Sequence, residues 1–301
     1  MPVKTALVTG ASSGIGEATA LKLQELGYTV YGAARRTDRL HKLAERGIRP
    51  LAMDVTDDAS MQAGIDQITA ETGRIDALVN IAGYGSYGAL EDVSLDEARY
   101  QFEVNVFGAI RLTQLALPHM RAQRSGTVVN ITSMGGKIYT PLGGWYHGTK
   151  FALEALSDCL RLEAKPFGID VVVIEPGGIA TEWGAIAADM LEKSSADGAY
   201  AAQASAVASS LRSEANAKRN SPPSVIADTI GKAVTARRPK TPKASAPARS
   251  SPCAGSCPTA PSTRSSPERS ASRADDAAPK TDGKPRPRAG SGTLAPALAL
   301  Q

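Results

Sequence analysis

The stretch that decides the fold lies close to the N-terminus and reads Thr9-Gly10-Ala11-Ser12-Ser13-Gly14-Ile15-Gly16. It joins a strand-like apolar run, residues 3–9, to a helical pattern that lasts until Gly27. Glycines let a ligand approach the backbone closely, and the start of a helix offers unpaired N–H groups and the positive end of a dipole. Three glycines could equally serve a tight turn, but their place between a first strand and a first helix favours binding. The stretch therefore predicts a cradle for the pyrophosphate of a dinucleotide.

Further along, strand-like runs of Val, Ile and Leu alternate with helical patterns. More strands are expected at residues 29–34, 48–53, 75–80, 127–132 and 169–175. The helices expected between and after them span residues 38–46, 57–72, 94–121 (with a bend near Pro118), 146–165 and 224–236. Such strands suit a sheet covered on both faces, and the β-α-β order predicts parallel strands with right-handed crossovers. We therefore predict an α/β fold, a doubly wound, Rossmann-type parallel sheet in a single domain, with ligands at the carboxyl ends of the strands.

The composition of the chain changes near residue 239. Eleven of the nineteen prolines follow that point, and the last aromatic residue is Tyr200. The segment 239–301 carries a charge balance of +6, which leaves −2 for residues 1–238 out of the total of +4. A segment so poor in large apolar groups cannot offset its ordering entropy by burial. We predict a folded, slightly acidic domain over residues 1–238 and a disordered, basic, Pro/Ser/Ala-rich tail over residues 239–301.

Composition also excludes several classes of protein. The apolar runs are only about as long as a strand, and the N-terminus enters such a run directly, so we expect no membrane span and no signal peptide. The chain has three cysteines, which favours a reducing, cytoplasmic location. Cys253 and Cys257 have no Cys or His after them, so we expect no metal site. Basic charge in the tail without aromatic residues gives at most non-specific binding, so we expect no specific nucleic-acid partner.

The residues after the second strand bear on the choice of dinucleotide. An NAD site usually places an acid there, whereas the 2′-phosphate of NADP requires a cation. Here Arg35 and Arg36 follow the strand and no acid stands at its tip. We therefore favour NADP(H) over NAD(H), with Arg35 as the main contact and Arg36 as its helper. The alternative is a solvated start to the next helix, and it applies to Arg36 more than to Arg35.

Residues at the ends of two further strands are candidates for contacts with the adenosine half of the dinucleotide. Asp54, with Val55 beside it, follows the third strand and could accept a hydrogen bond from the adenine amino group. Its alternative role is a helix N-cap ahead of Asp57. The run Asn80-Ile81-Ala82-Gly83 follows the fourth strand and would let the backbone pass close to the ribose, although alone it would only mark the end of a strand.

Candidate catalytic residues follow in order. Tyr146 and Lys150 are four residues apart in an expected helix and so share one face. An ammonium near a phenol, whose ordinary pKa is about 10, favours the phenolate and lowers that pKa. Ser133 follows the fifth strand, where its hydroxyl could bind a substrate oxygen, and Asn105 is a polar residue in an apolar helical stretch. Taken singly, the Tyr–Lys pair could be a surface contact, Ser133 a cap and Asn105 the cause of a helix kink. Because all four occur together after a dinucleotide cradle, a catalytic role is favoured.

The sequence resembles the short-chain dehydrogenase/reductase family, in its classical form, over residues 3–238. The resemblance rests on six motifs, which are Thr9-Gly10-x-x-x-Gly14-x-Gly16, Asn80-x-Ala82-Gly83, Asn105, Ser133, Tyr146-x-x-x-Lys150 and Pro176-Gly177-Gly178-Ile179-Ala180-Thr181. It implies that Tyr146 exchanges the proton and that Lys150 lowers its pKa and binds the nicotinamide ribose. It also implies that Ser133 positions the substrate carbonyl and that Asn105 maintains a water-linked proton relay.

The same resemblance implies an activity and a cofactor site. The activity is hydride transfer between NADP(H) and a carbonyl or secondary alcohol, with NAD(H) as the alternative cofactor. Residues 174–183 are similar to a ketone- and aldehyde-reducing branch that includes hydroxysteroid- and retinol-dehydrogenase-like members, and four of them would line the nicotinamide end. The full set of expected cofactor contacts is Gly10, Ser12, Ser13, Gly14, Ile15, Gly16, Arg35, Arg36, Asp54, Val55, Asn80, Ala82, Gly83, Tyr146, Lys150, Pro176, Gly177, Ile179 and Thr181.

The chain departs from the family in two places. Ile81 stands where the family usually has a second Asn, which removes a hydrogen bond that helps to hold the central sheet. After the last helix the family adds one more strand, which completes the sheet edge and supports a subunit interface, but residues 238–243 here contain two prolines. If each codon's third base is read with the first two bases of the next codon, residues 251–263 can encode an amphipathic, aromatic-containing segment. We therefore hypothesise that the tail is read out of frame. The rival interpretation is a functional basic linker.

These departures leave alternatives open. A chain without its last strand could be a catalytically impaired, dinucleotide-binding regulatory or scaffold protein, and the fold also supports epimerisation or dehydration. The complete catalytic set argues for the oxidoreductase. The weakly periodic segment 184–219 is expected to be a helical flap over the site. Five aromatic residues suggest a small apolar carbonyl or alcohol substrate, namely Tyr84, Tyr87, Tyr139, Trp145 and Trp183. A homodimer or homotetramer is expected from the family.

Overall fold

The computed structural model describes residues 3–236 and contains one parallel sheet within them. Its strands are β1 (Thr5–Thr9), β2 (Thr29–Ala34), β3 (Arg49–Ala52), β4 (Ala77–Asn80), β5 (Gly126–Ile131) and β6 (Ile169–Ile174). They lie in the order β3-β2-β1-β4-β5-β6, and Leu7 at the centre pairs with Tyr31 on one side and Leu78 on the other. This order confirms the predicted doubly wound, Rossmann-type fold.

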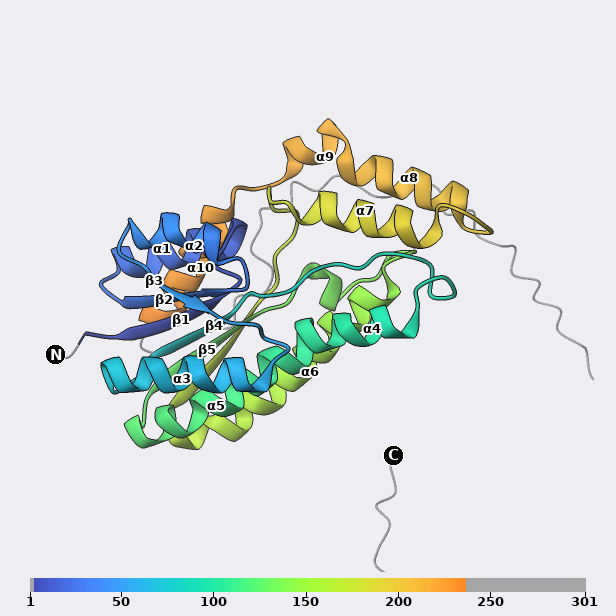
Figure 1. The fold of residues 1–301 in the computed structure, drawn as a ribbon. Coiled ribbons are helices and arrows are strands. Elements are labelled where there is room, and N and C mark those ends of the chain that lie inside the picture. The colour runs from blue at the N-terminus through green and yellow to red at the C-terminus, as the bar shows by residue number, and fades with distance from the viewer. Residues whose placement is uncertain (1–2, 237–301) are drawn as a thin grey trace, which may run out of the picture. The chain divides into compact units, whose positions relative to one another are not determined.

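Helices cover both faces of this sheet (Figure 1). One face carries α1 (Gly14–Glu25), α2 (Thr37–Ala44) and α10 (Pro223–Thr235), and the other carries α3 (Asp58–Thr72), α5 (Gly108–Gln123) and α6 (Gly144–Ala164). Successive side chains of a strand point to opposite faces, so Val8 is buried against the first group while Leu7 is buried against the second. Because both faces are covered, every residue of β1 is apolar or a buried threonine.

The position of the site follows from the strand order. From β1 the chain moves outward to β3 and then crosses back to β4, so a crevice opens where the carboxyl ends of β1 and β4 diverge. The Thr9 hydroxyl spans this point and accepts hydrogen bonds from the backbone N–H groups of Ile81 (3.0 Å) and Ala82 (3.1 Å). The Ile81 side chain, in place of the family's amide, packs against the apolar core.

The long helix expected over residues 94–121 is interrupted. The structure has α4 (Leu95–Phe102), a π-helical turn η1 (Glu103–Phe107) and then α5, and Pro118 lies inside α5. The break in the regular α-helix thus surrounds Asn105. A π-turn inserts an extra residue per turn and re-aims the side chains around it, and such turns are frequent at functional sites.

Residues 183–219 form three helices beyond the sheet, namely α7 (Trp183–Ser195), α8 (Ala201–Arg212) and α9 (Glu214–Arg219). Figure 1 shows α7 and α8 running side by side. The cluster between them is built largely of small residues, including Ala187, Ala188, Ala204 and Ala208. The helical content of the predicted flap is therefore present, while its motion stays a prediction.

The remaining short elements are the 3₁₀ turns η2 (Met134–Gly136) and η3 (Lys165–Phe167). The place where the family adds its last strand, residues 238–243, and the predicted tail, residues 239–301, lie outside the described residues. Between residues 3 and 236, no helix combines the length and the apolar character needed to cross a bilayer.

Candidate active site

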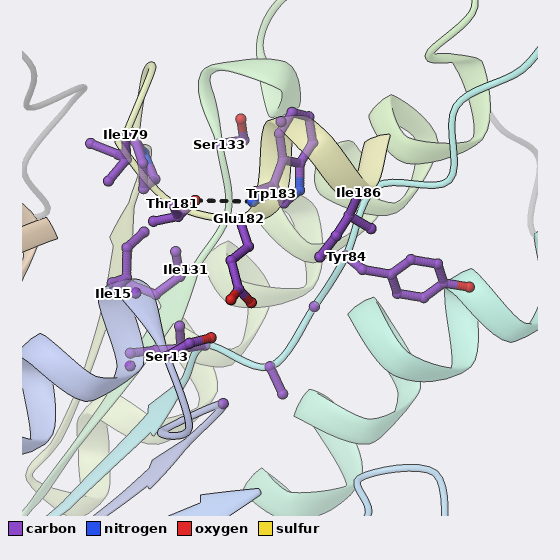
Figure 2. A pocket seen from close by; sticks show the side chains of 18 of the residues that line it. Ser13, Ile15, Tyr84, Ile131, Ser133, Ile179, Thr181, Glu182, Trp183 and Ile186 are labelled. Carbon is purple, nitrogen blue, oxygen red and sulfur yellow. Dashed lines mark hydrogen bonds between the residues drawn. The ribbon is translucent and has the colours of Figure 1, made fainter. Parts of the chain in front are cut away.

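A cavity of about 1270 Å³ lies at the carboxyl ends of the strands. Every predicted cofactor contact except Asn80 lines it, and three predicted catalytic residues, Ser133, Tyr146 and Lys150, line it as well. Asn105 lies behind the wall. Figure 2 shows Ser13 and Ile15 of the glycine-rich stretch facing Ser133, Thr181 and Trp183 across this cavity.

The glycine-rich stretch forms a close-fitting cradle. Gly10 has φ 67°, and a Cβ there would lie 3.0 Å from the Ala82 backbone nitrogen. A Cβ at Gly16 would lie only 2.1 Å from the Gly10 carbonyl oxygen, so neither position accepts a larger residue without movement. Ser13 precedes α1 without capping it through its side chain, which leaves the first N–H groups of α1 directed at the cavity. These residues fit a pyrophosphate.

Arg36 and Arg35 both line the cavity and have different hydrogen-bond partners there. The Arg36 guanidinium donates to the hydroxyls of Ser12 (3.2 Å) and Ser13 (3.3 Å). Arg35 donates to the Tyr100 hydroxyl (2.8 Å). The geometry therefore puts Arg36, expected to be only the helper, next to the phosphate cradle.

An acidic residue closes over this end of the cavity. Glu182 accepts from Arg39 at 3.0 and 3.1 Å and lies 3.7 Å from Arg36. Figure 2 shows its side chain pointing into the cavity. The pairs are half-exposed and so contribute little free energy. Sequence reasoning missed Glu182, because only the folded chain brings it within reach of α2.

Asp54 lies on the cavity wall and does not cap α3. One carboxylate oxygen accepts from the backbone N–H and the hydroxyl of Thr56, at 2.9 and 2.8 Å. The N-cap is Asp57, which accepts from Ala59 and Ser60. The other oxygen of Asp54 lies 4.0 Å from Arg35. The N-cap alternative for Asp54 is thus wrong, and its position suits an adenosine contact.

Asn80 is expected among the cofactor contacts, but its side chain turns into the core and does not line the cavity. Its amide nitrogen donates to the Asn130 amide oxygen (2.9 Å) and the Thr113 hydroxyl (3.1 Å) in the core. Asn130 in turn donates to the Ser157 hydroxyl (2.9 Å). A buried amide needs hydrogen-bond partners, and these hydrogen bonds link β4, β5, α5 and α6. The following residues, Ile81 to Gly83, line the cavity instead.

Tyr146 and Lys150 both lie in α6 and are buried, with 7% of each residue exposed. The Lys150 ammonium nitrogen is 5.9 Å from the centre of the Tyr146 ring and donates to the Ile131 carbonyl oxygen at 3.0 Å. Burial lowers the pKa of Lys150 to about 8, an effect that the charge of Glu154 opposes. The two side chains face the same cavity, as their spacing predicts.

The expected lowering of the Tyr146 pKa is not seen. Burial raises the pKa of this phenol above its ordinary value, and the nearby Ser133 hydroxyl opposes the rise. The phenolate would lose its hydration in this apolar wall, and the Lys150 ammonium is directed at the Ile131 carbonyl rather than at the phenol oxygen. Tyr146 is therefore held in the neutral phenol form, which is the form that can give up a proton.

Asn105 organises the segment after β4. Its amide oxygen accepts from the Tyr84 backbone N–H (3.0 Å), and its amide nitrogen donates to the Tyr84 carbonyl (2.9 Å) and the Thr149 hydroxyl (3.1 Å). The buried amide of Asn105 therefore has hydrogen-bond partners for both its oxygen and its nitrogen. A Cβ at Gly83 would lie 3.0 Å from the Asn105 oxygen and 3.7 Å from the Lys150 nitrogen, so the two side chains meet beside Gly83.

Aromatic rings form the wall around Tyr146. Tyr87 and Trp183 lie with ring centres 5.8 and 5.1 Å from it, and burial raises the pKa of Tyr87 to about 12. Tyr84 also lines the cavity, whereas Tyr139 and Trp145 do not. Among the described residues, no group of His, Cys, Asp and Glu side chains could hold a metal ion.

Comparison with known proteins gives consistent results. A family model described as short chain dehydrogenase matches residues 4–191. The chain is 42% identical over 176 residues to a 3-ketodihydrosphingosine reductase from Bacteroides thetaiotaomicron. That match covers 58% of this chain and 64% of the relative, so it spans somewhat less than two thirds of the relative's length.

Solved structures agree. A short-chain dehydrogenase from Streptomyces avermitilis is similar with a TM-score of 0.71 and 34% identity, over 81% of this chain and 88% of that chain. A metagenomic short-chain oxidoreductase in complex with NADP has 25% identity and a TM-score of 0.63, over 81% and 96% of the two chains. A short-chain dehydrogenase/reductase from Burkholderia phymatum in complex with NAD has 25% identity and a TM-score of 0.70, over 79% and 88%. The chain belongs to the short-chain dehydrogenase/reductase family of oxidoreductases.

Proposed function

We propose that this chain transfers a hydride between NADP(H) and an apolar carbonyl or secondary alcohol, with Tyr146 as the proton donor or acceptor. One observation carries the proposal: Tyr146, Ser133 and Lys150 line the same cavity as the glycine cradle. A proton donor, a second hydroxyl and a cation thus face the space next to a phosphate-binding turn. Acid–base catalysis requires this proximity.

The cradle supports a nicotinamide dinucleotide as the cofactor. Gly10 and Gly16 let the backbone segments of the cradle pack closely together, and the start of α1 would hold the pyrophosphate. Pro176, Gly177 and Thr181 would line the nicotinamide end. When bound, the nicotinamide supplies or receives the hydride.

The protein side chains would then manage the charge on the substrate oxygen. The Ser133 hydroxyl and the Tyr146 phenol donate hydrogen bonds to the carbonyl oxygen, which becomes more negative as the carbon is reduced. Tyr146 gives its proton to that oxygen, and the Lys150 ammonium stabilises the phenolate that remains. Because burial raises the pKa of Tyr146, the phenol stays protonated until the substrate oxygen takes its proton.

Two arginines support NADP(H) as the preferred form. Arg36 lies beside Ser12 and Ser13, and Arg35 lies on the cavity wall 4.0 Å from Asp54. A 2′-phosphate would gain two cations in this place, whereas NAD(H) would gain none. We expect Arg36→Ala to lower the preference for NADPH over NADH about 10- to 100-fold, a loss of one charge-assisted contact.

The wall around Tyr146 supports an apolar substrate. Tyr87, Trp183 and Ile186 surround the side of the cavity next to Tyr146, and the charged residues on the wall lie mostly toward the cradle. The similar reductase from Bacteroides thetaiotaomicron is named for a ketone with a long alkyl chain. We expect long-chain ketones to be better substrates than short ones, because each buried CH₂ contributes about 0.8 kcal/mol.

The test is oxidation of NADPH by the full chain, followed by loss of its absorbance, with a panel of aldehydes, alkyl ketones and steroids. Tyr146→Phe should reduce the rate roughly 100- to 10,000-fold, the usual contribution of a proton donor, while still binding NADPH. Tyr139→Phe is the matched control, because Tyr139 is exposed and lies outside the cavity. Equal rates for wild type and Tyr146→Phe would refute the assignment. NADPH binding without turnover on any carbonyl would favour the catalytically impaired alternative.

A further inference from the structure

His147 is a buried side chain that the proposed reaction does not use. It follows Tyr146 in the first turn of α6, and only 6% of it is exposed. Its Nδ1 lies 2.9 Å from the Gly135 carbonyl oxygen, and its Nε2 lies 3.1 Å from the Thr140 backbone nitrogen. The ring therefore bonds two backbone groups in the segment that leads from Ser133 to Tyr146.

These partners determine where the ring carries its hydrogen. A carbonyl oxygen can only accept, so Nδ1 must donate to Gly135. A backbone N–H can only donate, so Nε2 must accept from Thr140, with the Thr140 hydroxyl also 3.0 Å away. An imidazole with one donor and one acceptor nitrogen is neutral. The geometry thus requires neutral His147 with its hydrogen on Nδ1.

The ring is also enclosed by the same segment. A Cβ at Gly135 would lie 2.9 Å from Nδ1, and one at Gly143 would lie 2.8 Å from Nε2. Between them Leu142 has φ 63°, a conformation that non-glycine residues seldom adopt and that surrounding contacts must hold. His147 supplies such contacts on both sides of Leu142.

The groups that face the ring are mostly uncharged. Tyr87, from the segment after β4, and Tyr146, from α6, have ring centres 6.3 and 5.7 Å away. Lys150 lies one turn along α6, and Lys137 of the bonded segment is directed at Glu154 and Glu175. Among the described residues, no carboxylate forms an ion pair with His147. A positive charge on this ring would therefore gain no compensating partner.

We propose that neutral His147 is a positioning residue that holds the segment between Ser133 and Tyr146, and so sets the separation of the two hydroxyls that bind the substrate oxygen. This rests on the proposed function of those hydroxyls. Protonation of His147 would add an N–H at Nε2 opposite the Thr140 N–H and break that bond. The segment would then loosen.

The first test does not depend on turnover. Nitrogen-15 NMR of the full chain distinguishes the two imidazole tautomers, and the chain has only three histidines, so His147→Gln assigns the signal. We expect the Nδ1-protonated form for His147. A signal from the Nε2-protonated form would overturn the proposal even if the enzyme reduces every carbonyl tested.

The second test uses paired substitutions. His147→Asn can still donate toward Gly135, His147→Gln can still accept near Thr140, and His147→Leu can do neither. Misplacement of catalytic groups by about 1 Å costs roughly 100-fold, so we expect kcat to fall about 10- to 100-fold in the Leu variant and less in the two amides. The dissociation constant of NADPH should stay within about twofold in all three, because no cradle residue bonds to His147.

Urea unfolding separates positioning from a general loss of stability. The kcat of the three His147 variants should follow the bond that each one retains, rather than their order of stability in urea. His119→Gln, on α5 and away from the cavity, should keep the wild-type kcat. A kcat of His147→Leu equal to that of both amide variants would overturn the proposal. A wild type without any turnover would instead refute the proposed function and leave the NMR result to decide on His147.

Discussion

The catalytic residues and the helical flap are built in contrasting ways. Tyr146 and Lys150 lie on α6, and Ser133 lies just after β5. Backbone groups fix their surroundings: Lys150 bonds to the Ile131 carbonyl, and Asn105 bonds to both backbone groups of Tyr84. The flap has a core largely of alanines, and Glu182 just before it is tied to α2 by half-exposed ion pairs. Burial energy scales with apolar area, and exposed ion pairs contribute little. We therefore expect the proposed catalytic residues to lie on the more stable part of the molecule and the flap to be the part that opens first.

Removing the buried cation should have the largest effect. Lys150→Met is expected to lower kcat/KM about 100- to 10,000-fold, because the phenolate left on Tyr146 after proton transfer loses its stabilising charge. Steady-state kinetics with NADPH checks this. Lys165→Met, an exposed lysine at the other end of α6, is the matched control and should leave the rate unchanged. A loss below about tenfold for Lys150→Met would mean that the cation is not part of the chemistry.

The same residue predicts a dependence of stability on pH. Burial lowers the pKa of Lys150 to about 8 from an ordinary 10.5, so between these pH values the unfolded chain binds more protons than the folded chain. The cost of burying the charged form is thus full below pH 8 and fades toward pH 10.5. Lys150→Met should stabilise the fold by roughly 1–3 kcal/mol at pH 7 and by less at pH 10. Urea unfolding at both pH values tests this, and equal gains would contradict it.

Matched leucine substitutions compare the two regions directly. Leu78 in β4 and Leu191 in α7 are both fully buried. Leu78→Ala should cost about 2–5 kcal/mol of global unfolding free energy. Leu191→Ala should change global unfolding by less than about 1 kcal/mol while speeding amide hydrogen exchange in α7 and α8, because the flap can open by itself. Equal losses in urea would show that the flap and the sheet unfold as one unit.

The smallest effect is expected at Glu182. Glu182→Gln removes the charge that pairs with Arg36 and Arg39, and stability should change by less than about 1 kcal/mol, as for other exposed pairs. NADPH should bind about two- to fivefold more tightly, since Arg36 no longer has a competing carboxylate. Fluorescence titration at low and high salt measures this. Weaker binding would mean that Glu182 contacts the cofactor favourably.

Local sequence patterns predicted much of this molecule. Residues 29–34 were expected as a strand and form β2, because a run of β-branched and small residues between turn signals has few other stable arrangements. The cradle and the Tyr146–Lys150 spacing were likewise readable, since each depends on residues close together in the chain. The site residues that line the cavity were found for this reason.

Other features depend on contacts between distant residues and could not be read in this way. The inward turn of Asn80 depends on Asn130 and Thr113, thirty to fifty residues away. The bonds of Asn105 depend on Tyr84 and Thr149, which are also far from it in the chain, while those of His147 depend on the path of the segment before α6. The pKa of Tyr146 is raised because aromatic rings around it remove water from the phenol. The sequence predicts a lowered pKa because only Lys150 is close to Tyr146 in the chain.

The sequence by itself determined the order of strands and helices, the phosphate-binding turn and the identity of the reactive side chains, because periodicity and short spacings act within a few residues. Only the tertiary structure decided which way those side chains point, how dry their surroundings are and which backbone groups hold them. Direction, desolvation and hydrogen bonding are set by neighbours that the chain brings together from far apart. For that reason the raised pKa of Tyr146 and the hydrogen-bond partners of His147 became apparent only in the folded protein.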